Sequence, residues 1–379
     1  MGLYEYLILL FNRVPGINLD DARILLCAYT GKAAFGIGGQ TVHSTFGLPV
    51  SQCGQTMPEL LASTANTLAC KLAKVRLIIL DEIYMLGSRT LNQINRRLQQ
   101  VFPTDTPFAG MSIISVGDFN QLPPVGDNWV FQPNSSRNPL AHLAGAPMWE
   151  PFCLFMMTKI TRQRDDLAFS IALNNMAVGQ MTSIDIELIN SRCYNINTLP
   201  IEAHGAIHLF ATNNEVDKYN NQVLSRMNTE GYSVKALNVV SGAPNPQAAR
   251  KALQSVNVLA TMETYGLSKN LFLRVDARYM VTVNIDTTDG LVNGSTGILK
   301  AIDYGRHKET SEKWPLLPAK GTTIHKSQGA TIEKVVVHIS KNVKISMLYV
   351  ASCSKATSSS GLFLVVNSGR FKPPTEISE

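Results

Sequence analysis

The sequence predicts an α/β protein built on mostly parallel β-sheets. Short runs of Val, Ile and Leu recur along the chain, and each ends in small or charged residues, as buried parallel strands do. Segments between them carry apolar residues three and four positions apart, which is the helical period. Strand and helix therefore alternate, as they do when helices cover a parallel sheet.

The strand-like runs lie at residues 24–28, 76–80, 112–116, 207–211, 334–338 and 362–366. The clearest helix is predicted over 88–102, where one face carries Leu91, Ile94, Leu98 and Phe102. Residues 133–139 read as a loop because they are rich in Asn, Ser and Pro.

A chain of 379 residues with 45% hydrophobic residues is long enough to bury a large core and to form two or three domains. We expect the boundary near residues 155–200, where the polar segment 179–200 has room for one helix at most. Apolar runs such as 6–11 are much shorter than the roughly 18 residues of a membrane span, so no membrane partner is predicted.

The net charge of +6 permits a polyanionic partner without requiring one. Six cysteines are widely spaced, and no Cys-x-x-Cys pair occurs. In a chain of this size such cysteines are expected to be free thiols rather than disulfides or zinc ligands. This predicts a reducing compartment, the cytosol or the nucleus.

The strongest chemical signal is a pair of acids, Asp81 and Glu82, directly after four apolar strand residues. Ligands bind at the carboxyl edge of a parallel sheet, where an Asp can hold Mg²⁺ and a following Glu can orient a water molecule. Gly117 and Asp118 follow the next strand, and Gln121 lies close enough in sequence to contact a γ-phosphate or its attacking water. Each acid alone fits a helix cap or loop equally well, but together they predict a nucleotide or metal site.

The stretch AYTGKAAFGIGGQTVHS (28–44) looks like a phosphate-binding loop because Gly31 and Lys32 follow an apolar run. It does not fit the pattern, because the residue five positions before Gly31 is Leu26 and Lys32 is followed by Ala33. The sequence Gly-Lys-Ser/Thr occurs nowhere in the chain.

Motifs of one known family occur in order: Ala28-Tyr-Thr-Gly-Lys-Ala-Ala-Phe with Thr41-Val-His-Ser, Leu80-Asp-Glu-Ile-Tyr-Met, Val116-Gly-Asp-Phe-Asn-Gln-Leu-Pro-Pro-Val, Thr161-Arg-Gln-Arg-Asp-Asp, Gly290-Leu-Val-Asn-Gly-Ser-Thr-Gly, Thr323-Ile-His-Lys-Ser-Gln-Gly-Ala-Thr and Tyr349-Val-Ala. From about residue 3 to 367 the chain closely resembles the Pif (petite integration frequency) branch of superfamily 1 DNA helicases. Among those it looks most like the helicase part of Helitron transposon proteins.

The resemblance implies two RecA-like domains that bind ATP between them and move 5′ to 3′ on single-stranded DNA. The first would span 1–155 and be incomplete, lacking the phosphate-loop strand, with a small insert at 48–76. A connection at 156–200 would carry the arginine-finger motif. The second domain would span 201–379, with a shortened insert near 298–320, so that the family's small SH3-like subdomain would be missing or truncated.

The resemblance also implies residue roles. Asp81 would bind Mg²⁺, Glu82 would activate water, Gln121 would sense the γ-phosphate, and Arg162 would act as an arginine finger. The nucleotide contacts would include Asp81, Glu82, Gln121, Arg162 and Gly329, with Lys355 in the place of a second finger. DNA contacts would fall to Thr30, Gly31, Thr41, His43, Thr323, His325, Lys326 and Gln328. The plain structural interpretation of the two histidines is capping or packing. A nuclear protein of DNA repair, recombination or telomere maintenance is implied as well.

Three departures from the family bear on activity, and one of them is the shortened insert near 298–320 described above. The resemblance implies that the chain begins just after the phosphate loop, because 2–14 resembles only the helix that follows it. The last motif has one extra residue and ends in Lys355 instead of arginine, which keeps the charge without the planar fork. Tyr84 also stands where serine is usual.

Four hypotheses follow from these observations. The first is a Pif-type helicase, inactive alone if the phosphate loop is missing. The second is a remnant that binds single-stranded DNA without hydrolysing ATP. The third is a metal nuclease that uses Asp81, Glu82 and Asp118. The fourth is a chain that folds poorly because the first sheet lacks a central strand.

Overall fold

The computed structural model describes residues 3–12, 23–49, 57–132, 148–157, 160–235, 240–258, 270–286, 289–302, 315–339, 345–353 and 355–366. The chain divides into two compact units, Met1–Thr161 and Arg162–Glu379. The predicted loop at 133–139 lies outside the described residues.

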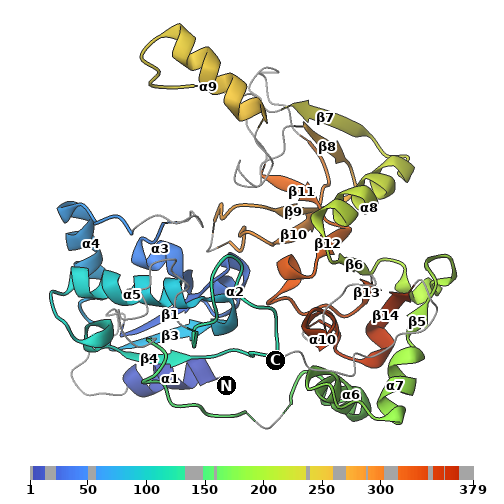
Figure 1. Ribbon diagram of the computed structural model, residues 1–379. Helices are drawn as coiled ribbons and strands as arrows, with labels where there is room; N and C mark the ends of the chain where they lie inside the picture. Colours follow the sequence, from blue (N-terminus) through green and yellow to red (C-terminus); the bar gives the residue numbers. More distant parts are fainter. Residues whose placement is uncertain are drawn as a thin grey trace. The chain divides into compact units, whose positions relative to one another are not determined.

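Unit 1 is built on a four-stranded parallel sheet in the order β2-β1-β3-β4 (Figure 1). The strands are β1 (Ile24–Ala28), β2 (Gln40–Thr41), β3 (Leu77–Asp81) and β4 (Ser112–Ser115). The apolar runs at 24–28, 76–80 and 112–116 therefore form strands in parallel register, as predicted. The two-residue strand β2 was not predicted, because no apolar run marks it in the sequence.

The helices of unit 1 are α1 (Leu3–Asn12), α2 (Gly31–Gly36), α3 (Val42–Phe46), α4 (Ala62–Leu72) and α5 (Ser88–Val101), with 3-10 helices η1 (Ile83–Met85) and η2 (Pro107–Gly110). Helix α5 confirms the prediction for 88–102, since Leu91, Ile94 and Leu98 are fully buried in the core with Ile78 and Leu80 of β3. The same core holds Val42 and Phe46, so the apolar side of α3 is fixed against the sheet.

Unit 2 is built on a five-stranded parallel sheet in the order β12-β6-β13-β14-β5. Its strands are β5 (Cys193–Tyr194), β6 (Ile207–Phe210), β12 (Gly321–Thr323), β13 (Val335–Ile339) and β14 (Leu362–Val366). All five residues of β14 are buried, in keeping with a strand covered on both faces. The runs predicted at 207–211, 334–338 and 362–366 form the three central strands.

The helices of unit 2 are α6 (Leu167–Ala177), α7 (Ser183–Asn190), α8 (Asn213–Arg226), α9 (Pro246–Val258) and α10 (Ile345–Cys353), with short 3-10 helices at Ile196–Thr198, Ile201–Ala203, His325–Ser327 (η7) and Ser359–Gly361. Capping boxes start α7 at Thr182 and α8 at Thr212. The segment 179–200, expected to hold one helix at most, also supplies β5, which pairs with the end of β14.

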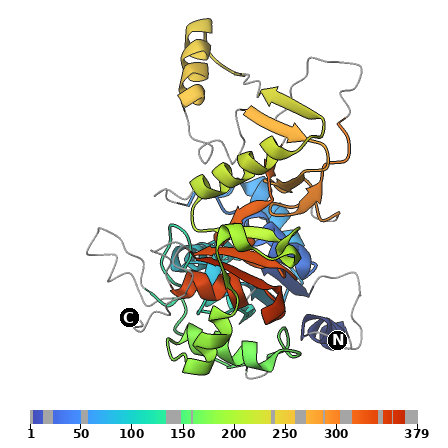
Figure 2. The ribbon, with the colours of Figure 1, turned by 90° about the vertical axis from the view of Figure 1, so that its right-hand side faces the viewer.

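Two small antiparallel sheets are inserted between α8 and β12. Strands β7 (Gly231–Lys235) and β8 (Asn270–Arg274) form a two-stranded ribbon, visible in Figure 2. Strand β9 (Arg278–Val281) pairs with β10 (Thr296–Ile298) on one side and β11 (Leu316–Pro318) on the other. A β-rich insert is therefore present here, while the proposed shortening near 298–320 falls partly on residues outside the description.

Candidate functional site

The carboxyl ends of β3 and β4 meet at one edge of the unit 1 sheet. The Val116 N–H donates to Leu80 O at 2.9 Å, and the Ile83 N–H donates to Val116 O at 3.0 Å. These bonds bring the Asp81-Glu82 pair beside the Gly117-Asp118 turn. The two acidic motifs that the sequence analysis singled out therefore share one edge, as ligand sites of parallel sheets require.

Glu82 has an unusual backbone conformation at this edge. Its φ of 54° and ψ of 47° lie in the left-handed region, which a residue with a Cβ seldom adopts. Its N–H donates to Asp81 Oδ1 at 3.0 Å. Such strain is found preferentially at functional sites, where the surrounding structure holds it in place.

The turn after β4 needs a glycine and uses Asp118 to shape its backbone. A Cβ at Gly117 would lie 2.9 Å from Ile83 Cγ2 and 3.0 Å from Ile83 N, too close for any other residue without movement. Asp118 Oδ1 accepts the Asn120 N–H at 3.0 Å, and Asp118 O accepts the Gln121 N–H at 3.1 Å. Asp118 thus has the turn-forming role that its plain interpretation predicts.

Gln121 carries a buried oxygen, Oε1, that has no hydrogen-bond partner among the described residues. A buried amide oxygen without a donor costs free energy, so this atom fits a site that is completed by a ligand or water. The carboxylate oxygens of Asp81 and Glu82 are suitable ligands for Mg²⁺, which commonly takes one or two carboxylates together with substrate phosphates.

A dedicated metal centre is not formed by these acids. In the part of the chain that the structure describes, no three His, Cys, Asp or Glu side chains come together to hold a metal ion. The nuclease hypothesis needs Asp81, Glu82 and Asp118 as one metal-binding cluster, and the described arrangement lacks that cluster.

Two predicted DNA-contacting threonines serve as helix caps in unit 1. Thr30 Oγ1 accepts the Ala33 N–H at 3.3 Å and starts α2, whose first residue is the buried Gly31. Thr41 Oγ1 accepts the Ser44 N–H at 3.3 Å and starts α3. Their hydroxyls thus have a structural role beside any contact with DNA.

His43 lies on α3, half-buried against Tyr29. The two rings meet edge to face with centroids 5.4 Å apart. Burial lowers the pKa of His43, so the imidazole is neutral at physiological pH. This packing matches the plain interpretation of His43.

The second group of predicted DNA contacts lies at the carboxyl end of β12 in unit 2. Thr323 is buried, and its Oγ1 accepts the Lys326 N–H at 3.3 Å at the start of η7. Gln328 is 5% exposed, and its Nε2 has no hydrogen-bond acceptor among the described residues. His325 is half-buried, with a pKa lowered by burial. Gly329 follows with a φ of 70°, where glycine is favoured.

Asn220 of α8 holds β12 in place. Its Nδ2 donates to Pro318 O at 2.7 Å and to Gly321 O at 2.9 Å, and its Oδ1 accepts the Gly321 N–H at 2.7 Å. A Cβ at Gly321 would lie 2.8 Å from Tyr219 Cδ1. The sequence analysis missed Asn220 because its partners are about a hundred residues away and no local pattern marks it.

The segments that carry Arg162 and Lys355 come together within unit 2. The Gln163 amide donates to Ala356 O at 2.9 Å, and Asp166 Oδ2 accepts both the N–H and the hydroxyl of Ser359, at 2.8 and 2.6 Å. Burial of Asp166 opposes its ionisation, but these bonds and the Phe169 N–H together lower its pKa.

The two predicted fingers differ in exposure. Arg162 is exposed, whereas the Lys355 side chain is 0% exposed. Lys355 O accepts the Ile332 N–H at 2.8 Å, which ties this turn to the segment leading into β13. A cation buried this deeply is a weaker candidate for a residue that reaches a nucleotide.

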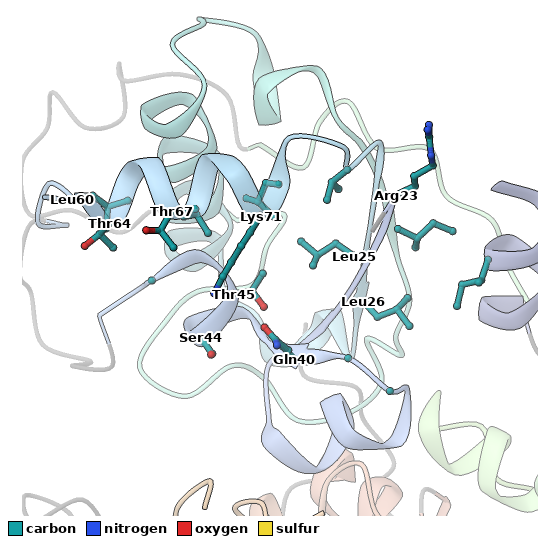
Figure 3. Close-up of a pocket in the computed structure, with 18 of the residues that line it drawn as sticks. Arg23, Leu25, Leu26, Gln40, Ser44, Thr45, Leu60, Thr64, Thr67 and Lys71 are labelled. Carbon is teal, nitrogen blue, oxygen red and sulfur yellow. The ribbon is translucent and has the colours of Figure 1, made fainter. Parts of the chain in front are cut away.

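A cavity of about 960 Å³ lies in unit 1 beside β1 and α4 (Figure 3). Leu25 and Leu26 line one side, while Lys71 extends from α4 toward Thr45 and Gln40. None of the predicted site residues is among the described residues that line it. The cavity is therefore separate from the edge that carries Asp81 and Glu82.

Three of the cysteines, Cys27, Cys70 and Cys153, are free thiols, as predicted. Across the described residues, no helix combines the length and the apolar character needed to traverse a bilayer.

Comparison with known proteins gives one consistent family. The model of the PIF1-like helicase family matches residues 8–183. The chain is 27% identical to the ATP-dependent DNA helicase Pif1 of Bdellovibrio bacteriovorus, covering 92% of this chain and 79% of that protein. It is 29% identical to the ATP-dependent DNA helicase PIF1 of Saccharomyces cerevisiae over 74% of this chain, which corresponds to 30% of the yeast protein.

A solved structure gives the same relationship. The crystal structure of a Pif1 helicase from Bacteroides in complex with ADP-AlF3 and single-stranded DNA superimposes with a TM-score of 0.67 at 25% identity, covering 98% of this chain and 88% of that one. Together with the two parallel sheets, this likeness confirms the predicted α/β class with RecA-like units. Over residues 8–183 in sequence, and over nearly its whole length in structure, the chain is similar to PIF1-like helicases.

Proposed function

We propose that this chain is an ATP-dependent DNA helicase that couples ATP hydrolysis to 5′-to-3′ movement on single-stranded DNA. The observation that carries the proposal is Glu82, held in a left-handed conformation directly after Asp81 at the sheet edge where β3 and β4 end. The relatives that the chain resembles are ATP-dependent DNA helicases.

Three residues of unit 1 have separate proposed roles in ATP hydrolysis. Asp81 would hold Mg²⁺, and Glu82 would orient and deprotonate the attacking water. Gln121 would use its buried amide oxygen, which has no partner in the described part of the chain, to fix that water or to sense the γ-phosphate. When bound, Mg²⁺ supplies charge that stabilises the phosphoryl oxygens.

Arg162 is the proposed arginine finger of unit 2. It is exposed on a turn whose neighbours Gln163 and Asp166 are fixed by hydrogen bonds to residues 356 and 359. A guanidinium on a rigid base can stabilise charge spread over phosphoryl oxygens. Gly329 and Lys355 are the remaining proposed nucleotide residues, although Lys355 is buried in this structure.

The proposed DNA contacts are the residues at the starts of α2 and α3 and at the end of β12: Thr30, Gly31, Thr41, His43, Thr323, His325, Lys326 and Gln328. Hydroxyls, amides and exposed backbone at such turns bind phosphates without reading bases. The buried, unpartnered Nε2 of Gln328 supports a ligand at this turn.

Measuring ATP hydrolysis with and without a single-stranded oligonucleotide tests the proposal. The chain is expected to hydrolyse ATP faster with DNA, and Glu82→Gln should lower kcat by about 10² to 10⁴, as loss of a general base does. Asp105→Asn, an exposed acid in the loop before η2, is the matched control and should keep full activity. Equal rates for the wild type and Glu82→Gln would refute catalysis.

A second candidate is a protein that binds single-stranded DNA without hydrolysis. The observation that favours it is the absence of Gly-Lys-Ser/Thr from the 379 residues, since that motif normally cradles the phosphates. Binding of a labelled oligonucleotide that weakens as salt rises, without hydrolysis, would select this candidate.

The finer assignments are proposals that rest on motif likeness. These are a Helitron-type origin, a nuclear location, and roles in DNA repair, recombination or telomere maintenance. The free cysteines fit a reducing compartment such as the nucleus. Imaging of the tagged chain in its own cells would test the location.

A further inference from the structure

Tyr84 is a buried residue next to the hydrolytic pair for which no motif assigns a role. It lies in η1, and its side chain is 0% exposed. A Cβ at Gly117 would lie 3.3 Å from Tyr84 Cδ1, so the ring fills the space beside the turn that follows β4. Tyr84 is thus fixed between the ends of β3 and β4.

The hydroxyl of Tyr84 is buried where the charges of Glu82, Asp118 and Asp81 act on it. Burial raises the pKa of Tyr84 above its ordinary value of 10.0. The Glu82 carboxylate raises this pKa further through its charge and through hydrogen bonding, and the charges of Asp118 and Asp81 do so as well. The hydroxyl makes no hydrogen bond of regular geometry with the described residues. A buried O–H without a good acceptor is costly, and the Glu82 carboxylate is the acceptor within reach.

We propose that Tyr84 is a positioning residue that donates a hydrogen bond from Oη to the Glu82 carboxylate and holds it in the orientation needed to activate water. This inference rests on the proposed ATPase function. A general base must lie within hydrogen-bond reach of the proton that it takes, and a glutamate side chain has rotamer freedom that a fixed donor can restrict.

A double-mutant cycle on unfolding tests the contact without nucleotide. Wild type, Tyr84→Phe, Glu82→Met and the double variant would be unfolded in denaturant while the fluorescence of Trp129 and Trp149, both in unit 1, is followed. Tyr84→Phe keeps the ring and removes only the hydroxyl. Its effect on the unfolding equilibrium constant is expected to be about tenfold larger when Glu82 is present, as for a hydrogen bond to a charged group.

ATP hydrolysis tests the positioning role. Tyr84→Phe should lower kcat by about tenfold and leave KM for ATP within about twofold, because orientation of the base affects the chemical step. Tyr279→Phe is the matched control. That tyrosine is buried in unit 2, where its Oη accepts the Arg274 N–H at 2.8 Å and donates to Phe272 O at 3.1 Å, and its loss should not couple to Glu82.

The outcomes separate this inference from the proposed function. If Tyr84→Phe changes the unfolding equilibrium constant equally with Glu82 and with Met at position 82, the proposed hydrogen bond is overturned, whether or not ATP is hydrolysed. Coupling with an unchanged kcat would overturn the positioning role. Coupling in a wild type that hydrolyses no ATP would support the contact and refute the helicase proposal.

Discussion

Arg162 and Arg164 allow the finger role to be tested at the scale of single residues. Both lie in one turn and both are exposed. Arg164 has a surface ion pair with Asp165 at 3.7 Å, in which both side chains are mostly exposed, and such pairs contribute little to stability. Only Arg162 occupies the position that the family motif assigns to the finger.

We therefore predict different results for Arg162→Ala and Arg164→Ala. The first should lower the kcat of DNA-stimulated ATP hydrolysis by about 10³ or more, the size known for arginine fingers. The second should leave kcat unchanged, and both should keep the wild-type melting temperature. Similar losses in the two variants would mean that the turn, rather than Arg162, is what activity requires.

At the scale of elements, α8 and β12 are joined through one side chain. Asn220 satisfies the N–H and C=O of Gly321 and the C=O of Pro318. It is 3% exposed, so no bulk water replaces these bonds when it is removed. Strand β12 is the edge of its sheet and ends at Thr323, so this clamp fixes the start of the second group of proposed DNA contacts.

Asn220→Leu should destabilise unit 2 by about 2 to 5 kcal/mol, because it leaves buried backbone groups of β12 without partners. Oligonucleotide affinity should fall as well, through displacement of Thr323 and Gln328. Asn221→Leu, at the exposed neighbouring position of α8, is the control and should change neither quantity appreciably. Calorimetry measures the loss of stability, and fluorescence anisotropy measures the loss of oligonucleotide affinity. Equal melting temperatures of the Asn220→Leu and Asn221→Leu variants would refute the clamp.

For the whole molecule, the dependence of stability on pH is set in part by a pair of histidines in unit 2, one buried and one half-buried. His208 of β6 and His338 of β13 share a hydrogen bond of 2.9 Å between Nδ1 and Nε2, and Tyr219 stacks on His208 at 4.5 Å. Burial lowers the pKa of both below their ordinary 6.5; the charges of His338 and Lys320 add to the effect at His208, and Glu215 opposes it at His338.

Both histidines are therefore neutral in the folded protein and gain protons on unfolding. Stability should be complete above pH 6.5 and should fall below it, by at most about 1.4 kcal/mol per pH unit for each histidine. Calorimetry between pH 7.5 and 5 measures this loss. The double variant His208→Leu with His338→Leu should show a flatter dependence, and an unchanged slope would exclude the pair as its source.

Much of the architecture could be predicted from the sequence. The apolar runs at 24–28 and 362–366 each form a five-residue parallel strand, so their pattern is local and clear. The short strands β2 and β5, with two residues each, carry no such pattern and exist because a neighbouring strand offers hydrogen-bond partners. In the two parallel sheets, local pattern therefore identified every strand of four or five residues, including the edge strand β4, and missed the shorter edge strands β2, β5 and β12.

The sequence alone determined the family-like order of motifs and the pairing of acids with strand ends, because both depend on residues close together along the chain. The tertiary structure decided which side chains support them. Tyr84 beside Gly117, Asn220 on Gly321, and Asp166 on Ser359 join segments through packing and long-range hydrogen bonds. Such contacts arise only when the chain has folded, because they depend on distances in space that no spacing along the sequence encodes.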